Sequence, residues 1–443
     1  MLATRSAQNS GWPDPQSSGP RPDTACWRLL SGPGGPGAEP LAQHVIRLGR
    51  RPIGGTWLMD VLDASNLRGR GGAAFPTGRK WRSVAAAANG DAVVVVNLAE
   101  GEPASFKDRT LGALRPHLIL DGAALAAESV AASRAVVYVG RAHAAARDAL
   151  RFAARERRGL KPEECHFDIV DAPDRYVAGE TSALVNRLNG GPSKPTITPP
   201  RPHQVGVLGR PTLIQNAETM AHVALIARYG AAWFRQVGTP DSPGTALVTV
   251  LGAVRRPGVI EVDRGATVGA VIEAAGGLTR APQAVLLGGY FGTWVAAFEA
   301  WNLRLDDKEL ANHGTSLGCG VVMVLPATSC GVAETARILR YLAGESAGQC
   351  GPCVFGLDWI ASAMERAARG RADASERDRL IRWAGQVSHR GACHHPDGAV
   401  RLLNSALRAF DGDLTLHLAR QPCPSAHKAA TILPAAPGGT GWQ

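Results

Sequence analysis

The sequence predicts an α/β fold in three parts: a parallel sheet with helices on its faces, a small β-grasp domain and a C-terminal helical bundle. Three observations support this prediction. Short β-branched runs alternate with Ala-rich helical runs from Leu41 to about Thr239, new strands begin near Gly244, and a helical period takes over from Val332. We therefore expect domains at 41–239, 240–328 and 329–423.

The two ends of the chain are expected to lie outside these domains. Residues 1–40 are rich in Pro, Gly and Ser and end in SGPGGPGAEP. Such a composition buries too little apolar surface to offset the entropy lost on ordering. We predict disordered tails at 1–40 and 424–443.

The first domain alternates strands and helices. The predicted strands are VVVV (93–96), AVVYVG (135–140) and HFDIVD (166–171), and the predicted helices between them cover 118–133 and 141–159. Strands and helices that alternate at this spacing are typical of a parallel sheet. Such sheets bind ligands beyond the carboxyl ends of their strands, where the loop NLAEGEP follows VVVV.

The second domain is a group of strands around one helix. TALVTVLGAV, VIEV, AVLLGG and CGVVMVL predict strands, and RRPG predicts the turn between the first two. The helix ATVGAVIEAAGG has Thr267 as a candidate N-cap and the pair Gly276–Gly277 to end it. This order predicts a β-grasp domain.

The last domain is predicted to contain four short amphipathic helices, at 334–344, 354–368, 376–387 and 399–410. Cys350, Cys353 and Cys393 lie at the ends of these helices. Eight cysteines in 443 residues are too sparse for a disulfide scaffold. Clustered cysteines are therefore candidates for metal binding or redox chemistry.

Charge and hydropathy exclude two classes of protein. The net charge of +10 comes from scattered cations, without a run of five or more like charges, and the few aromatic residues do not alternate with cations. We therefore expect no nucleic-acid binding. The N-terminus lacks the apolar core of a secretory signal, and no apolar run reaches the roughly 18 residues of a membrane span. We expect a cytoplasmic protein without membrane insertion of its own.

The stretch LRGRGGAAFPTGRKW has four glycines and four cations in fifteen residues. Gly69, Gly71 and Gly72 allow backbone amides to approach a ligand closely, and Arg70 and Lys80 supply positive charge, so a phosphate is the expected guest. The spacing is neither a Walker motif nor a dinucleotide fingerprint. A mobile basic surface loop is the alternative interpretation.

A second loop offers hydrogen-bond acceptors. Asn97, Glu100 and Glu102 follow the strand VVVV. Their oxygens suit a ribityl hydroxyl, a ring N–H or a carboxamide. The two loops together describe a ligand with an anionic end and a donor-rich end, such as a flavin mononucleotide (FMN) or a nicotinamide dinucleotide.

Five motifs in one order carry a family resemblance: SNLRGRGGAAFPTGRKW, NLAEGEPASFKDR, YVAGETSALVNRLNGG, GRPTLIQNAET and ESAGQCGPC. From about Leu41 to Phe410 the chain resembles the NADH-binding flavoprotein subunit of respiratory complex I and its relatives in NAD-linked hydrogenases and formate dehydrogenases. The resemblance implies a Rossmann-like FMN-binding domain, a ubiquitin-like, SLBB-type β-grasp domain and a helical iron-sulfur domain.

The resemblance also implies roles for individual residues. NADH would approach the flavin over Gly72, Ala73 and Phe75, with Glu102 and Tyr176 nearby. Hydride would pass to FMN, and single electrons would leave through a [4Fe-4S] cluster on Cys350, Cys353 and Cys393 to a quinone- or ferredoxin-linked partner. The partner would be a complex I-like subunit or a ferredoxin-like protein, which places the chain in the cytoplasm or at the periphery of a membrane complex. The residues implied to hold FMN are Gly69, Arg70, Gly71, Lys80, Asn97, Glu100, Gly179, Glu180, Asn216 and Thr219.

Some of these residues also have a purely structural interpretation. Glu180 stands where a helix is expected to begin, and the helix dipole favours a carboxylate there. Tyr176 would simply cover a helix end. Trp81 is more typical of a core anchor than of a stacking residue.

The chain departs from the family pattern around the nicotinamide site. Ala99 replaces an Asp and Thr181 a Glu, while Ser83 and Arg201 stand where relatives have aromatic rings. Of three rings that would hold the dinucleotide, only Phe75 remains. Each lost ring weakens stacking by about 1 to 3 kcal/mol, unless Arg201 compensates by stacking on adenine or pairing with phosphate.

The metal site departs from the pattern as well. Ala347 replaces the first cysteine of the family's Cys-x-x-Cys-x-x-Cys, which leaves three thiolates for a cluster that takes four. Zinc on three Cys and one His, or an empty site, are alternatives. The candidates for the fourth ligand are an external group, Ser346, His394, His395, Cys330 and Cys423.

Three functions therefore compete. The first is an FMN-dependent oxidoreductase that takes hydride from NADH and passes electrons onward. The second is a flavin relay that no longer uses NADH, and the third is a scaffold subunit with a vacant flavin cleft. The complete Gly-Arg-Gly-Gly stretch favours the first two, because a vacant cleft does not need conformationally costly glycines.

Overall fold

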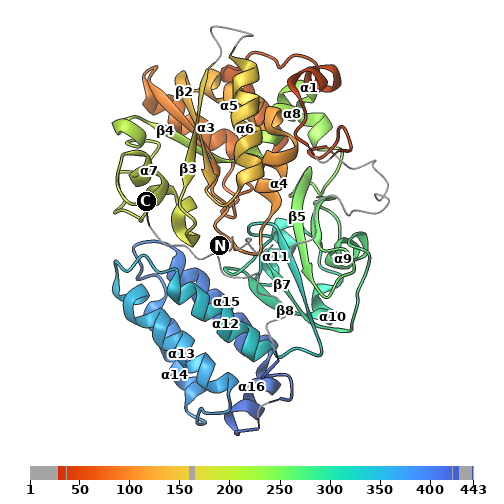
Figure 1. Cartoon of the computed structure of the whole chain (residues 1–443), viewed down its shortest axis with the longest axis vertical. Coiled ribbons are helices and arrows are strands. Elements are labelled where there is room, and N and C mark those ends of the chain that lie inside the picture. The colour runs from red at the N-terminus through yellow and green to blue at the C-terminus, as the bar shows by residue number, and fades with distance from the viewer. Residues whose placement is uncertain (1–27, 36, 159–164, 422, 429–441, 443) are drawn as a thin grey trace, which may run out of the picture.

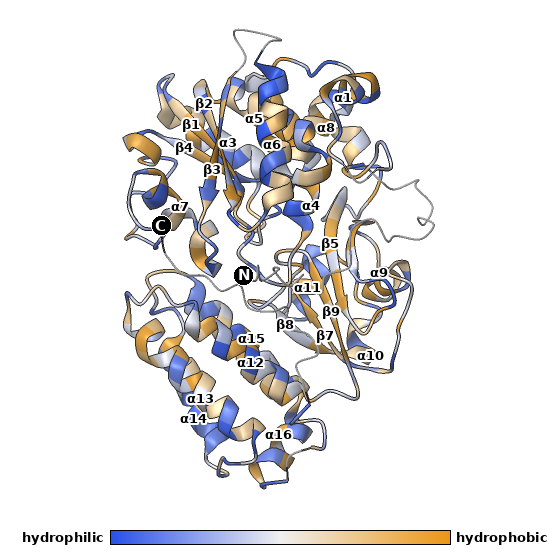
Figure 2. Ribbon diagram, viewed as in Figure 1, coloured by the Kyte–Doolittle hydropathy of each residue, from blue (hydrophilic) through white to orange (hydrophobic). Residues whose placement is uncertain are grey.

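Two sheets and a helical bundle make up the fold of this computed structural model, which describes residues 28–35, 37–158, 165–421, 423–428 and 442 (Figure 1). The first sheet lies at the top of the view, and the second sheet and the bundle lie side by side below it. Figure 2 shows the strands of both sheets largely in orange, as expected for strands that form the core.

The first sheet is parallel and has the strand order β3-β2-β1-β4. Its strands are β1 (Ala92–Leu98), β2 (Ala132–Gly140), β3 (His166–Ala172) and β4 (Thr212–Asn216). The three predicted strands are confirmed, and β4 is an addition. The helices and short helical turns of this part are α1 (Leu41–Leu48), α2 (Thr56–Ser65), α3 (Thr77–Ala88), α4 (Lys107–Leu114), α5 (Pro116–Ser129), α6 (Ala144–Arg157), η3 (Tyr176–Gly179), α7 (Thr181–Leu188), η4 (Val207–Gly209) and α8 (Ala217–Phe234).

The second sheet has the order β6-β5-β9-β7-β8, with β5 and β9 parallel at its centre and antiparallel strands outside them, as in a β-grasp fold. Thr267 caps the helix as predicted, because its Oγ1 accepts the Ala270 N–H (3.1 Å), and Gly276 and Gly277 end it with φ of 86° and 78°. The elements are β5 (Thr245–Gly252), β6 (Gly258–Asp263), α9 (Val268–Ala274), β7 (Pro282–Leu287), β8 (Thr293–Ala296), α10 (Ala297–Ala300), α11 (Asp307–Asn312) and β9 (Val321–Pro326).

The C-terminal part is a bundle in which the four predicted helices are present and one more follows them. Its elements are α12 (Gly331–Gly344), a π-helical turn η5 (Pro352–Gly356), α13 (Leu357–Ala368), α14 (Glu376–Val387), α15 (His395–Ala409) and α16 (Asp411–Leu418). Among the described residues, no helix combines the length and the apolar character that a membrane crossing requires.

Part of the expected N-terminal tail is folded, so the prediction of disorder over 1–40 is wrong for the residues that the structure describes there. The backbone N–H groups of Arg28, Leu29 and Leu30 donate to the carboxylate of Glu261 on β6, at 2.8 to 3.0 Å. Leu29 is fully buried. Glu261 thus satisfies the backbone donors of a segment too poor in apolar residues to fold alone. Residues 1–27 and 36 lie outside the described part of the chain.

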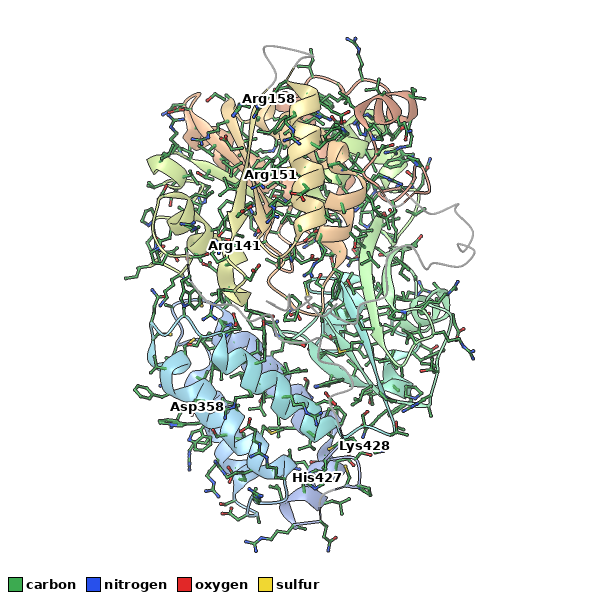
Figure 3. All side chains as sticks on the ribbon, in the orientation of Figure 1. Arg141, Arg151, Arg158, Asp358, His427 and Lys428 are labelled. Atoms are coloured by element: carbon green, nitrogen blue, oxygen red, sulfur yellow. The ribbon has the colours of Figure 1, made fainter. Side chains whose placement is uncertain are left out.

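The end of the chain is also partly folded, so the predicted disorder over 424–443 is wrong for 424–428 and Trp442. Arg337 of α12 donates to the Lys428 carbonyl (2.6 Å), and Figure 3 shows His427 and Lys428 at the foot of the bundle. The Arg175 guanidinium lies 4.3 Å from the ring centre of Trp442. Arg337 and Arg175 thus bind parts of a C-terminal segment whose composition alone predicts disorder. Residues 429–441 and 443 lie outside the described residues.

Candidate functional site

The glycine loop, which we define as residues 69–75 of the stretch LRGRGGAAFPTGRKW, lies against the start of α8. Its ends are held together by the Gly69 N–H, which donates to Phe75 O (2.9 Å), and the Arg70 N–H donates to Thr219 Oγ1 (2.9 Å). Gly72 has a φ of 101°, where a side chain is disfavoured. A Cβ on Gly71 would come 3.3 Å from the Asn216 Cβ. The loop therefore needs its glycines to approach this helix end.

The start of α8 stands at the carboxyl end of β4. Asn216 is its N-cap, and its Oδ1 accepts the N–H groups of Glu218 (3.0 Å) and Thr219 (3.4 Å). Its Nδ2 donates to Asp108 Oδ2 (2.7 Å). The partial positive charge of a helix N-terminus is thus next to the bare backbone of the glycine loop.

Lys80 brings a full positive charge to the same sheet edge. Its Nζ donates to the carbonyl of Ile214 on β4, and no carboxylate of the described residues lies within 4.0 Å of it. Burial lowers the pKa of Lys80 to about 8. A partly buried ammonium without an anionic partner, beside a glycine loop and a helix N-terminus, fits a phosphate group.

The Arg70 side chain is held by backbone carbonyls at and before the start of β5. Its guanidinium is buried and donates to the carbonyls of Thr245 (3.0 Å) and Pro243 (3.4 Å), with the Glu218 carboxylate at 3.9 Å. The expected role of this side chain as a phosphate partner stays a prediction, although these carbonyls already bind it. Arg70 joins the loop to β5, and Lys80 is the predicted cation whose charge is available to an anion.

A buried ion network that the sequence analysis missed supports the loop. Lys107 Nζ contacts Asp108 Oδ1 and Glu218 Oε2, both at 2.8 Å, and Glu218 Oε1 accepts the Leu247 N–H (3.0 Å). Glu218 is 1% exposed and Lys107 2%. The network connects α4, α8 and β5, the elements around the glycine loop. In the sequence, Lys107 and Asp108 belong to the motif KDR and Glu218 belongs to the motif NAET. The two motifs are about 110 residues apart, so no local pattern indicates that they pair.

Asn97 and Gly179 meet at the end of β1. The Asn97 Nδ2 donates to Gly179 O (2.8 Å), and its Oδ1 accepts the Ala99 N–H (3.2 Å). A Cβ on Gly179 would come 3.3 Å from the Ala99 Cβ. Glu180 is the N-cap of α7, and its Oε2 accepts the N–H groups of Ser182 and Ala183 at 2.9 Å. The structural interpretation of Glu180 is confirmed.

Glu100 is occupied by the protein itself. Its two carboxylate oxygens accept hydrogen bonds from Ser105 Oγ, Asp108 N, Arg109 N and Arg109 Nε, at 2.8 to 3.1 Å. Although burial by itself raises the pKa of Glu100, Arg109 and neighbouring cations lower it to about 2. Four bonds are the usual capacity of a carboxylate, so Glu100 holds the loop to α4, and its direct contact with flavin stays a prediction.

Glu102 and Tyr176 form a pair where the three parts of the chain meet. Glu102 Oε2 accepts the Tyr176 hydroxyl (2.7 Å) and the Tyr290 N–H (2.8 Å), and Oε1 accepts the Ala104 N–H (3.1 Å). The Tyr176 N–H donates to Glu345 Oε2 (2.9 Å), just beyond α12. Burial raises the pKa of Glu102 to about 7, although these hydrogen bonds oppose the rise.

We expect Glu102 to make stability fall with pH. Its pKa is about 7 in the folded chain and near 4.5 when unfolded, so the folded chain binds more protons between these values. The free energy of unfolding should lose about 3 kcal/mol from pH 4.5 to 7 because of this group. Urea denaturation of the wild type and Glu102→Gln across this range measures it. The slope should flatten in Glu102→Gln, whereas Glu299→Gln, on an exposed residue, should keep it; equal slopes would contradict the assignment.

The remaining predicted nicotinamide residues lie on an open surface. Gly72, Ala73 and Phe75 are exposed, and the Arg79 guanidinium lies 5.8 Å from the Phe75 ring centre. Ser83 is exposed on α3, where its hydroxyl donates to Arg79 O (3.0 Å). Arg201 is exposed too, and its backbone N–H donates to Gln204 Oε1 (3.2 Å).

The three predicted metal ligands gather near the C-terminal end of α12. Cys350 and Cys353 lie just before and in the π-helical turn η5, and Cys393 lies two residues before His395, whose Nε2 is 2.8 Å from Leu342 O in the last turn of α12. Ala347, at the position of the missing cysteine, is buried. Ser346 comes directly before Ala347, and its Oγ accepts the Gly348 N–H (3.1 Å).

Other candidates for the fourth ligand are placed elsewhere. His394 is almost fully exposed, and His395 is buried with its Nε2 2.8 Å from Leu342 O. Cys330 precedes α12, so 14 helical residues, roughly 21 Å, separate it from the other end of that helix. Cys423 lies beside Cys330. Both thiols are therefore excluded as ligands of the Cys350 group.

Fold and site together define a class of protein: a redox flavoprotein with a mononucleotide cradle on a parallel sheet and a cysteine-bearing helical bundle. Three family matches agree with this class. Residues 62–225 match the Nuo51 FMN-binding domain, 247–289 the SLBB domain, and 333–417 the iron-sulfur binding region of NADH-ubiquinone oxidoreductase F. The chain belongs to the family of NADH-quinone oxidoreductase F subunits.

Individual relatives span most of the chain. It is 33% identical to the F 2 subunit of NADH-quinone oxidoreductase from Rhizobium meliloti (strain 1021), over 83% of this chain and 90% of that protein. It is 31% identical to the F subunit of NADH-quinone oxidoreductase from Rhodobacter capsulatus, over 81% and 86%. The crystal structure of an NAD+-reducing [NiFe]-hydrogenase in the H2-reduced state superposes with a TM-score of 0.75 at 32% identity; it covers 83% of this chain, which spans 62% of that hydrogenase chain.

Proposed function

We propose that this chain is an FMN-dependent oxidoreductase subunit that takes hydride from NADH and passes single electrons to an iron-sulfur centre and a redox partner protein. FMN supplies the change from two-electron to one-electron chemistry. The observation that carries the proposal is the unpaired ammonium of Lys80 beside the glycine loop and the start of α8. This donor set suits a phosphate monoester, and the family membership supports FMN as the ligand that carries this phosphate.

The residues around the proposed FMN site have distinct roles. The amides of Gly71 and Gly72, the first turn of α8 and Lys80 bind the phosphate, while Gly69 closes the loop through its bond to Phe75 O. Asn97, Gly179 and Glu180 line the ribityl side at the end of β1. Asn216 and Thr219 fix the loop to α8, while Arg70 and Glu100 hold the surrounding backbone from behind.

Glu102 and Tyr176 are proposed to border the nicotinamide site, with Gly72, Ala73 and Phe75 as its floor. The raised pKa of Glu102 means that near pH 7 its carboxyl group is present in both the protonated and the ionised form. The Tyr176 hydroxyl fixes the Oε2 atom of that group at 2.7 Å. In this proposal the Glu102 carboxyl group, fixed by Tyr176, is a hydrogen-bonding partner for the nicotinamide next to the FMN-binding loops.

The purified chain tests this function directly. We expect a yellow protein that releases about one FMN per chain and whose flavin absorbance bleaches on addition of NADH. A colourless chain that takes up no FMN after refolding with an excess of it would overturn the flavin proposal. Flavin that stays oxidised under millimolar NADH but is bleached by a reduced ferredoxin would limit the chain to electron relay.

For the metal centre we propose three thiolates, from Cys350, Cys353 and Cys393, with Ser346 as the fourth ligand. Ser346 supports this set by its position, because it is adjacent to Ala347 at the place of the missing cysteine. Iron and labile-sulfide analysis, with low-temperature spin resonance of the dithionite-reduced protein, tests it. Absence of both iron and sulfide from anaerobically prepared protein would contradict a cluster at this position.

Adding a ring to the nicotinamide site should tighten NADH binding. Ser83 is exposed on α3, one helical turn from Arg79, so a Phe there meets no packed neighbour. Stacking on adenine contributes about 1 to 3 kcal/mol, so Ser83→Phe should lower the KM for NADH about 5- to 100-fold. Bleaching of the flavin at varied NADH measures this. Ser83→Leu, which adds apolar bulk without a ring, is the control, and an equal gain in both variants would argue against stacking.

A further inference from the structure

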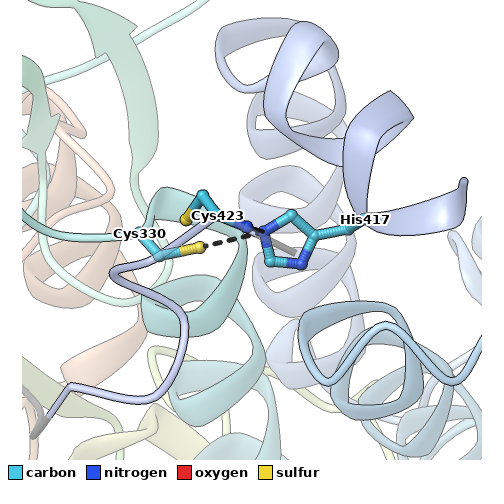
Figure 4. Close-up of side chains that lie close together, drawn as sticks. All are labelled: Cys330, His417 and Cys423. Atoms are coloured by element: carbon cyan, nitrogen blue, oxygen red, sulfur yellow. Dashed lines mark hydrogen bonds between the residues drawn. The ribbon is translucent and has the colours of Figure 1, made fainter. Parts of the chain in front are cut away.

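A second cluster of metal-binding side chains lies far from the cysteine group just described. Cys330 precedes α12, His417 belongs to the last turn of α16, and Cys423 follows that helix (Figure 4). One ligand atom from each residue lies within 4.8 Å of the others. Because α12 separates this cluster from Cys350 and its neighbours, the two groups cannot share one centre.

The His417 ring is oriented as a metal ligand would be. Its Nδ1 lies 3.1 Å from both Ala367 O and Ala368 O, two carbonyls at the end of α13 that can only accept. The proton is therefore on Nδ1, which leaves the lone pair of Nε2 directed at the two cysteines. A histidine that donates its other N–H to a backbone carbonyl is the usual arrangement around a bound metal.

The sulfurs of both cysteines lie within 4.8 Å of this nitrogen and of each other. Cys330 Sγ lies 3.5 Å from His417 Nε2 and accepts the Ala333 N–H (3.4 Å) at the start of α12. The Cys423 N–H donates to the same Nε2 (3.2 Å). Metal binding would replace the hydrogen bonds that His417 Nε2 accepts from the Cys330 thiol and the Cys423 N–H, and would draw the three ligand atoms closer together.

The donor chemistry selects the metal class. Two sulfurs and one imidazole nitrogen, without a carboxylate, favour zinc over magnesium or calcium. His417 and Cys330 are buried, whereas Cys423 is partly exposed, so a fourth position is open to water on that side. We propose that Cys330, His417 and Cys423 bind one zinc ion, which is separate from the iron-sulfur site.

The site would have a structural task. Cys423 begins the described C-terminal segment 423–428, which is otherwise held by Arg337 through Lys428 O and by Lys428 Nζ on Thr328 O (3.3 Å). A shared ion would fasten this segment to the start of α12 and to α16. It would close the end of the bundle opposite the proposed cluster.

Cobalt titration of the chelator-treated full-length chain tests the proposal. Wild type should bind one equivalent with thiolate-to-cobalt charge-transfer absorption and visible bands of tetrahedral cobalt, and zinc should displace it. Cys330→Ser and Cys423→Ser should each lose this equivalent or bind it at least 10-fold more weakly. Cys165→Ser, at a thiol outside both groups, should bind as wild type does, and Cys423→His should retain binding because it keeps a ligand.

Three results would overturn the proposal. The first is a wild-type chain without tetrahedral cobalt bands. The second is unchanged binding in Cys330→Ser and Cys423→Ser, which would place the ion at Cys350 and its neighbours. The third is a Cys330–Cys423 disulfide in freshly isolated protein, found by mass spectrometry of the unreduced chain. If Cys423→Ser fails to fold, Cys423→His alone decides, since loss of the cobalt bands in a folded Cys423→His chain would contradict the site.

Discussion

Replacing Lys80 by Met should weaken FMN binding about 10- to 100-fold, because a hydrogen bond to a charged group contributes about 1.5 to 3 kcal/mol. Lys80 has no carboxylate partner among the described residues, so Met removes the charge without leaving a buried anion behind. The free energy of unfolding of the flavin-free chain should therefore stay the same or rise. Fluorescence titration of FMN and urea denaturation measure the two effects.

Arg82→Met is the matched control for Lys80→Met. Arg82 lies on the same helix but is exposed and paired with Asp60 and Asp63 at 2.7 Å. The Arg82→Met substitution should leave the affinity for FMN unchanged. Equal weakening in both variants would show that the net charge of α3, and not the position of the Lys80 ammonium, governs binding.

Replacing Glu218 by Gln should produce the largest loss of stability, about 3 kcal/mol, because it leaves Lys107 and Arg70 buried without their shared carboxylate. Although burial by itself raises the pKa of Glu218, Lys107, His222 and Arg70 hold it well below its ordinary value. Its stabilisation is therefore full above the ordinary carboxyl pKa and is lost as the pH falls below it. Urea denaturation at pH 7 and at pH 4 should show the difference from wild type shrinking.

Glu299→Gln serves as the reference for Glu218→Gln, because Glu299 is an exposed glutamate on the short helix α10. It should change the free energy of unfolding by less than about 0.5 kcal/mol. A Glu218→Gln chain as stable as Glu299→Gln would mean that the buried network contributes no net stability. In that case the glycine loop would be positioned by packing and backbone hydrogen bonds.

The fold was predictable where the sequence pattern is local. The Val run of β1 and the apolar spacing of α12 to α15 identify those elements without reference to any other part of the chain. β4 and β8 escaped prediction because five and four residues carry too little periodicity. The segment Arg28–Leu30 escaped for another reason: its order depends on Glu261, more than 230 residues later, which no local pattern reveals.

The site was predictable to the same extent. Glycines between cations indicate an anion cradle whatever surrounds them, and the structure brings that loop to a helix N-terminus. The direction of each charged side chain was not predictable, because it depends on partners from distant segments. Arg70 is drawn to carbonyls of Pro243 and Thr245, and Glu100 to the first turn of α4.

Tyr176 gives the molecule a mechanical link between its two redox regions. Its hydroxyl is held by Glu102 and its backbone amide by Glu345, which lies five residues before Cys350. The end of the bundle that carries the cysteines is thus bonded directly to the residue that we propose beside the nicotinamide. Glu102 and Glu345, which lie in different parts of the chain, are therefore joined through a single tyrosine, and no strand of the parallel sheet takes part in this connection.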